Sequence, residues 1–165
     1  MSKEFVKWLV PLRSQLQDDL LSLRNSLRRL PRQETHTSES RMAAWLLGAG
    51  FSLWRAVFLA DVSLAPDKNM QDAEAFLDRV LLDHTIVYRD DKNSWSFGYY
   101  INNARFRLKQ AAKELKDSER MDKLDGELRI LKDGLKGADM GAREAYENVH
   151  KVMHILTGLL AKRLV

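Results

Sequence analysis

The sequence predicts an all-α fold, a helical bundle of about five to six helices with a four-helix core, and three observations support this. Apolar residues return at every third or fourth position through most of the chain, which places them along one side of an α-helix. Only 3 prolines and 8 glycines interrupt the 165 residues, so long helices are possible. A chain near this length can bury about 70% of its unfolded surface, so we expect one domain over residues 1–165.

Composition narrows the possible functions. The chain has no cysteine, which excludes disulfides, thiolate zinc sites and cysteine nucleophiles. It also has no Gly-rich phosphate loop and no Ser/His/Asp spacing. The net charge of +4 is mild. The first residues lack the pattern of a signal peptide, so we expect a cytoplasmic protein that does not contact membranes.

The first helix is predicted from a leucine stripe that ends before Pro31, because proline cannot continue a helix. Pro11 is expected either in the first turn or at a kink. Residues 31–41 contain no apolar side chain and are expected to form an exposed linker, with Ser38 or Ser40 capping the next helix. The stripe consists of Leu9, Leu12, Leu16, Leu20, Leu23, Leu27 and Leu30.

The second segment, residues 42–60, is the most apolar and has a single charge, Arg55. A transmembrane span needs about 20 apolar residues, whereas the uncharged run here, 42–54, has 13. Arg55 near a bilayer centre would also cost about 2.5–3.5 kcal/mol. We therefore expect the central helix of the bundle, with Gly48 and Gly50 allowing another helix to approach closely.

Four further helices are predicted in residues 69–84, 97–115, 121–135 and 142–159, each from apolar residues at alternating steps of three and four. Short connections favour antiparallel neighbours. Gly137 is expected to end the fifth helix and Asp139 to cap the sixth. The fourth helix is expected to present a basic side opposite its apolar stripe, formed by Arg105, Arg107, Lys109, Lys113 and Lys116.

The last helix carries the most suggestive group of polar residues. Arg143, Glu147, His150 and His154 lie at i, i+4, i+7 and i+11, so they share one face. The simplest interpretation is a solvated face, whose charge pairs contribute only about 0.2–0.5 kcal/mol each. The histidine spacing also permits a two-histidine metal site. A di-iron centre is not predicted, because its second Glu-x-x-His motif is absent, and we expect no metal or cofactor.

The segment from Arg143 to His150, Arg-Glu-Ala-Tyr-Glu-Asn-Val-His, resembles the Arg-x(4–6)-His pattern of the HEPN superfamily. Those proteins are small helical bundles, and many are dimeric ribonucleases of toxin–antitoxin and defence systems. The resemblance implies that His150 handles the proton of an RNA 2′-hydroxyl and that Arg143 holds the phosphate. A second match joins Arg79 to His84, but those two side chains diverge by about 140° on a helix.

Residues 95–103 contain a dense aromatic group followed by two asparagines. Trp95 and Tyr99 are expected to close over one end of the bundle, while Phe97 and Tyr100 join the core. Aromatics this dense also suit a ligand pocket or an interface. Asparagine is a poor helix former, so the last two residues of the group are candidate ligand or interface residues, namely Asn102 and Asn103.

Together these patterns favour a non-enzymatic interaction protein that associates with itself or with a protein partner. The alternative is a HEPN-like protein that binds or cleaves RNA through Arg143 and His150. Basic residues such as Arg24 and Arg28 lie near one another, but acidic residues are interspersed, which is typical of a solvated surface. We place Trp95, Tyr99, Asn102, Asn103, Glu147 and His154 in the candidate ligand or interface set.

Overall fold

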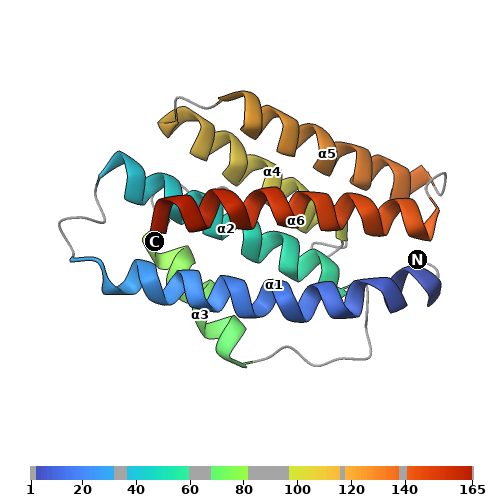
Figure 1. Ribbon diagram of the computed structural model, residues 1–165, viewed down its shortest axis with the longest axis horizontal. Helices are drawn as coiled ribbons and strands as arrows, with labels where there is room; N and C mark the ends of the chain where they lie inside the picture. The colour runs from blue at the N-terminus through green and yellow to red at the C-terminus, as the bar shows by residue number, and fades with distance from the viewer. Residues whose placement is uncertain are drawn as a thin grey trace.

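The computed structural model describes residues 3–31, 37–59, 68–81, 97–115, 118–137 and 141–164. Over these residues the protein is all-α, as predicted, with six helices and no strand (Figure 1). The helices are α1 (Lys3–Arg29), α2 (Ser38–Leu59), α3 (Lys68–Val80), α4 (Phe97–Glu114), α5 (Ser118–Gly137) and α6 (Ala142–Leu164).

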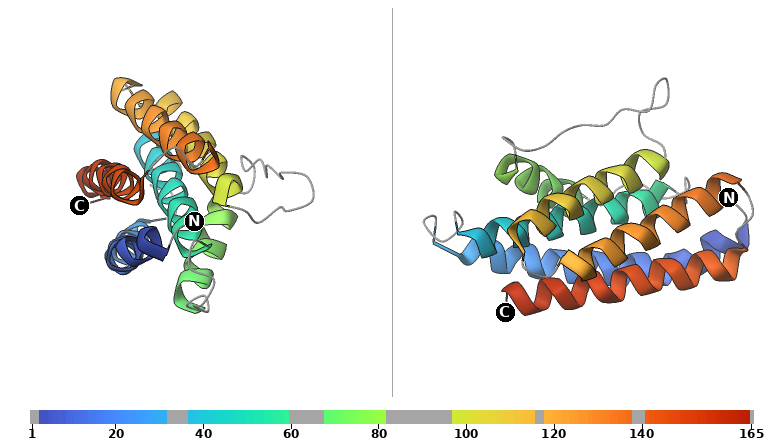
Figure 2. Two further views of the ribbon diagram at one scale, coloured as in Figure 1. Left: turned by 90° about the vertical axis from the view of Figure 1, so that its right-hand side faces the viewer. Right: turned by 90° about the horizontal axis from the view of Figure 1, so that it is seen from above.

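Helix α2 is the centre of the bundle. It packs against α1, α3, α4 and α6, and every residue from 42 to 54 is buried. The end-on view in Figure 2 shows α2 with α1 and α6 on one side and α4 and α5 on another. This confirms that the apolar segment is a central helix. Within the described ranges, no helix is both long enough and apolar enough to cross a membrane.

Helices α4, α5 and α6 follow one another along the chain and alternate in direction, as expected (Figure 1). Helix α1 also runs antiparallel to α2. The pair formed by α1 and α6 differs. Trp8 contacts Tyr146 near the start of both helices, and Asp19 and His154 line one hollow further along both. The first and last helices therefore lie side by side and parallel.

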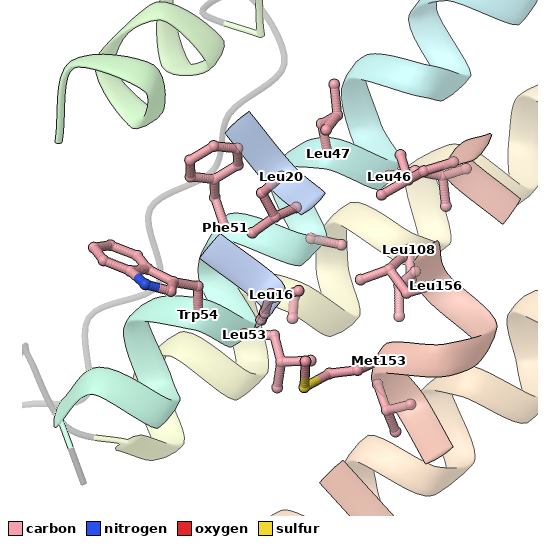
Figure 3. Close-up of a cluster of buried hydrophobic side chains, with 14 of the residues drawn as sticks. Leu16, Leu20, Leu46, Leu47, Phe51, Leu53, Trp54, Leu108, Met153 and Leu156 are labelled. Atoms are coloured by element: carbon pink, nitrogen blue, oxygen red, sulfur yellow. The ribbon is translucent and has the colours of Figure 1, made fainter. Parts of the chain in front are cut away.

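The predicted stripes form the core. In Figure 3, Leu16 and Leu20 of α1 lie against α2, with Leu20 beside Phe51, and Leu156 of α6 lies beside Leu108 of α4. These five side chains are at most 2% exposed. Burying a leucine or phenylalanine contributes about 1.5–3 kcal/mol, so the alternating stripes explain why the helices associate as they do.

Two glycines of α2 allow close packing, as the sequence predicted. A Cβ added at Gly50 would lie 2.5 Å from Leu20 Cδ2, and one at Gly48 would lie 3.0 Å from Arg107 Cδ. Arg107 itself is a correction to the predicted basic side of the fourth helix. It is 5% exposed, and its Nη1 donates a hydrogen bond to the Gly48 carbonyl at 2.8 Å. The space left by the missing side chain of Gly48 accommodates the arginine.

The start of α2 also differs from the expectation. Thr37 caps the helix, because its Oγ1 accepts a hydrogen bond from the Ser40 backbone N–H at 3.1 Å. The Ser38 hydroxyl instead donates to Glu114 Oε2 of α4 at 2.8 Å.

Pro11 lies inside α1, not in its first turn. Helix α5 ends at Gly137 as predicted, and the proposed cap of α6, Asp139, lies outside the described residues.

Candidate functional site

The outer face of α6 carries the four polar residues singled out in the sequence. Arg143 and Glu147 form an ion pair, with Nε and Oε1 3.4 Å apart and side chains 84% and 63% exposed. His150 and His154 follow on the same face, and both are exposed. The opposite side of the helix is buried in the core. The structure therefore brings the predicted group together on an open surface.

Aromatic rings form a continuous row along this face, which we call the ring row: Trp8, Tyr146, His150 and His154. The centroids of the Trp8 and Tyr146 rings are 5.0 Å apart. Tyr146 stacks on His150 at 6.1 Å, and His150 lies parallel to His154 at 6.5 Å with an angle of 3° between the planes. Trp8 remains 40% exposed, so a large apolar ring lies at the surface at one end of the row.

A hollow of about 390 Å³ lies between α1 and α6 beyond the other end of the ring row. Burial raises the pKa of the Asp19 carboxyl in its wall, and the neighbouring carboxylate of Asp18 raises this pKa further. The remaining wall is small or polar, apart from Leu23. The lining residues are Asp19, Ser22, Leu23, His154, Thr157, Gly158 and Ala161.

A second polar cluster lies between α4 and α5. Lys132 Nζ donates to Asn102 Oδ1 at 2.9 Å, and Arg105 Nε donates to Asp125 Oδ1 at 2.7 Å. The Arg105 and Asp125 side chains are only 18% and 16% exposed. These contacts join two helices and occupy the side-chain oxygen of the candidate residue Asn102. The adjoining hollow, of about 290 Å³, is lined by Asn102, Arg105, Phe106 and Lys109.

The other candidates from residues 95–103 have different positions. Tyr99 is 3% exposed, and its ring meets the Tyr100 ring edge to face with centroids 4.9 Å apart. It belongs to the core, so the prediction that it closes over one end of the bundle was wrong. Asn103 is also buried, with 8% exposure, and presents no surface to a partner. Trp95 lies outside the described residues. Burial on α4 thus removes two residues from the candidate surface.

The contact between Trp8 and Tyr146 was not predicted from the sequence. Trp8 is four residues before Leu12 and therefore on the same side of α1, so its position near the buried stripe could have been predicted. The contact of Trp8 with α6 could not have been predicted, because it depends on the parallel packing of two helices far apart in the chain. Reasoning also missed Glu127, a buried residue of α5 whose Oε1 lies 2.9 Å from Lys151 Nζ of α6.

The basic residues near the end of α1, for which the sequence favoured a solvated surface of mixed charge, lie beside α3. The Arg28 guanidinium lies over the Phe76 ring of α3, 5.3 Å from its centroid. Burial lowers the pKa of Arg24, the nearby charge of Arg28 lowers it further, and Asp72 opposes both effects. Arg28 is exposed and Arg24 is half-buried, with the acidic Asp72 close to Arg24. Because positive and negative charges are mixed here, the residues that α1 and α6 expose along the ring row are the better candidate site.

The ring row offers apolar contact at Trp8 and imidazole nitrogens at His150 and His154, and Arg143 on the same face of α6 adds a cation. Among the described residues, no group of three or more acidic or histidine side chains could hold a metal ion. Comparisons of the chain with protein-family models, with curated proteins and with solved structures return no match.

Proposed function

We propose that this protein is a helical interaction protein that associates with a second copy of itself through the outer face of α1 and α6. The observation that carries the proposal is the arrangement of one partly exposed ring and one hollow on the same face. Trp8 lies at one end, packed against Tyr146, with 40% of its surface exposed. The hollow beside Gly158 and Ala161 lies towards the other end.

This arrangement is self-complementary. In a two-fold dimer, each surface patch of one copy meets the matching patch of the other, so residue i contacts j and j contacts i. The hollow lies about ten residues beyond Tyr146 on α6, which corresponds to roughly 15–17 Å at 1.5 Å per residue. With the helices of two copies antiparallel, Trp8 of each copy can enter the hollow of the other. The two-fold axis then passes near His150.

The composition of the face supports this use. Tryptophan and tyrosine dominate interface hot spots, because they bury a large area with few rotatable bonds. Gly158 has open space where a Cβ would be, so it leaves room for a ring from outside. Thr157 Oγ1 donates to the Met153 carbonyl at 2.8 Å within its own helix, so its hydrogen-bonding group is already satisfied when a partner covers it.

The test is the oligomeric state, measured by sedimentation velocity across a concentration series. We expect the parent protein to form dimers, and Trp8→Ala and Gly158→Lys each to shift it to monomers while the helical circular dichroism spectrum is unchanged. Hot-spot truncation removes about 2 kcal/mol or more of binding free energy, which corresponds to roughly a thirtyfold weaker dimer.

Ile130→Ser is the matched control, because Ile130 is an apolar residue of α5 with 56% exposure away from this face. It should leave association unchanged. A parent protein that remains monomeric at every concentration contradicts the proposal. Dimers that weaken equally in Ile130→Ser and Trp8→Ala also contradict it, because the interface would then lie elsewhere.

The second candidate function is RNA binding or cleavage of the HEPN kind. The favouring observation is that Arg143 and His150 share one accessible face, as that resemblance requires. Arg143 is engaged by Glu147, so a phosphate would have to displace this carboxylate. Incubation with single-stranded RNA, with His150→Ala as comparison, tests it. Cleavage by the parent that the variant abolishes would support this function, and no cleavage or binding by the parent would exclude it.

A further inference from the structure

We propose that His150 and His154 form a two-histidine binding site for a divalent transition-metal ion of the Ni²⁺, Cu²⁺ and Zn²⁺ group. Residues four apart on a helix are surface neighbours, with Cβ atoms about 5–6 Å apart. Imidazole nitrogen is a ligand that these ions prefer, whereas Mg²⁺ and Ca²⁺ prefer oxygen. Both ligands belong to one helix of one chain, so the site does not need the proposed self-association, which would cover this face and compete with the ion.

The geometry of the pair supports joint coordination. The two rings are parallel to within 3°, with centroids 6.5 Å apart, so both side chains leave the helix in the same direction. Both residues are exposed, which lets an ion with its water shell approach and lets the rings close on it. The pair therefore needs rotation of side chains only, not movement of the backbone.

Core packing fixes the spacing of the two ligands. The residues immediately before them, Val149 and Met153, are 0% and 5% exposed, so this part of α6 is held against the bundle. A helix that is already ordered loses little further entropy when it chelates an ion. An isolated peptide with the same two histidines would have to form its helix first.

The surroundings indicate a site with two protein ligands. Glu147, one turn before His150, points its carboxylate at Arg143, with Nε and Oε1 3.4 Å apart. The described residues offer no set of three ligands for one ion. Water molecules would complete the coordination shell, so the ion should exchange freely and a chelator should remove it.

The experiment titrates Ni²⁺ by isothermal calorimetry into the untagged full-length Trp8→Ala protein, in which no second copy covers the two histidines. The expected result is one ion per chain, reversed by EDTA, with no heat from Mg²⁺. His150→Ala and His154→Ala should each raise the apparent Kd by at least about tenfold, since even the loss of an outer-shell partner changes metal affinity by 10–100-fold. With Cu²⁺, the electron paramagnetic resonance spectrum should show coupling to two nitrogens.

In the same Trp8→Ala background, where the proposed interface is already lost, Gly158 provides matched controls, because it is exposed and a Cβ there meets nothing within 4 Å. His150→Ala combined with Gly158→His places the second histidine four residues after His154 and should restore binding. His154→Ala combined with Gly158→His leaves two histidines eight residues apart, about 12 Å along the helix. That variant should bind as weakly as His154→Ala alone.

Several results would overturn the site: no Ni²⁺ binding by the Trp8→Ala protein, equal affinity in the four-residue and eight-residue variants, or one ion per two chains. The Trp8→Ala variant separates this inference from the proposed function. It should lose dimers and keep the ion. Loss of the ion in monomeric, folded Trp8→Ala would mean that two chains build the site together, and the single-helix chelate would then be wrong.

Discussion

Gly50 of α2 and Leu20 of α1 meet where no additional carbon atom fits, because a Cβ at position 50 would lie 2.5 Å from Leu20 Cδ2. Leu20 is 0% exposed and cannot move aside into solvent. Overpacking a core costs about 1–3 kcal/mol, while replacing a helical glycine by alanine gains up to about 1 kcal/mol. We expect Gly50→Ala to lower the free energy of unfolding by about 1 kcal/mol, measured by urea denaturation.

Gly126→Ala is the comparison for this prediction. A Cβ at position 126 of α5 meets nothing within 4 Å, so the helix gain of up to about 1 kcal/mol should appear without a clash. The two substitutions should therefore change stability in opposite directions. Stabilisation by both would show that Leu20 has room to rearrange.

Arg107→Met tests the buried arginine of α4. The substitution keeps an unbranched side chain against α2 but removes the donor to the Gly48 carbonyl, which lies 2.8 Å from Nη1. Hydrogen bonds that involve a charged group contribute about 1.5–3 kcal/mol. We expect a loss of about 2 kcal/mol in the free energy of unfolding. Lys109→Met, at an exposed position of the same helix, should change stability by no more than about 0.5 kcal/mol.

Lys151→Met tests the ion pair between α5 and α6. Glu127 is 7% exposed, and its Oε2 has no hydrogen-bond partner among the described residues. Removing Lys151 would leave this buried carboxylate without its cation, which should cost about 1–3 kcal/mol. Arg143→Met breaks a pair on the open face of α6, and its effect should stay within about 0.5 kcal/mol. Equal effects in thermal or urea unfolding would contradict this ranking.

Asp19→Asn tests the carboxyl group in the wall of the α1–α6 hollow, whose charged form is disfavoured by burial and by Asp18. Burial, and then the charge of Asp18, raise the Asp19 pKa above its ordinary value of 3.8. A raised pKa means that the folded state binds the proton more tightly than the unfolded state, so this contribution to stability is present below pH 3.8 and is lost as pH rises through the folded pKa. The variant should therefore be more stable than the parent at neutral pH.

The gain from Asp19→Asn should shrink as pH falls towards 3.8, because protonation then relieves the parent protein as well. Urea denaturation at neutral and acidic pH measures the difference. Asp122→Asn, at an exposed position of α5, is the control for loss of a surface carboxylate, and its effect on stability should stay within about 0.5 kcal/mol. A gain that grows on acidification would mean that Asp19 is stabilised in its charged form.

Periodicity was sufficient to predict the fold class and the buried side of each helix, because burial of leucine stripes dominates the association of helices. It also predicted that Gly48 and Gly50 permit close approach. It failed at Arg107. Charge and spacing place that residue among exposed basic side chains, but the space above Gly48 belongs to another helix and does not show in the local sequence of α4.

The candidate site was predicted only in part. The shared face of Arg143, Glu147, His150 and His154 follows from helical geometry alone. The contribution of Trp8 depends on a contact between residues about 140 positions apart, and Tyr99 is buried by its neighbours on other helices. Local patterns describe what one helix presents, whereas the identity of the helix opposite is decided by the packing of the whole bundle.

The parallel pairing of α1 with α6 has a consequence for how the chain reaches its native state. Helix α1 is synthesised before α6, so its leucine stripe is not fully covered until α6 has been made, and long-range pairing of this kind slows folding. During synthesis, the intermediate exposes part of the surface that α6 later covers, so it should depend on chaperones more than a bundle built from successive hairpins. Ribosome-bound chains arrested before α6 should therefore be cut readily by proteases within α1.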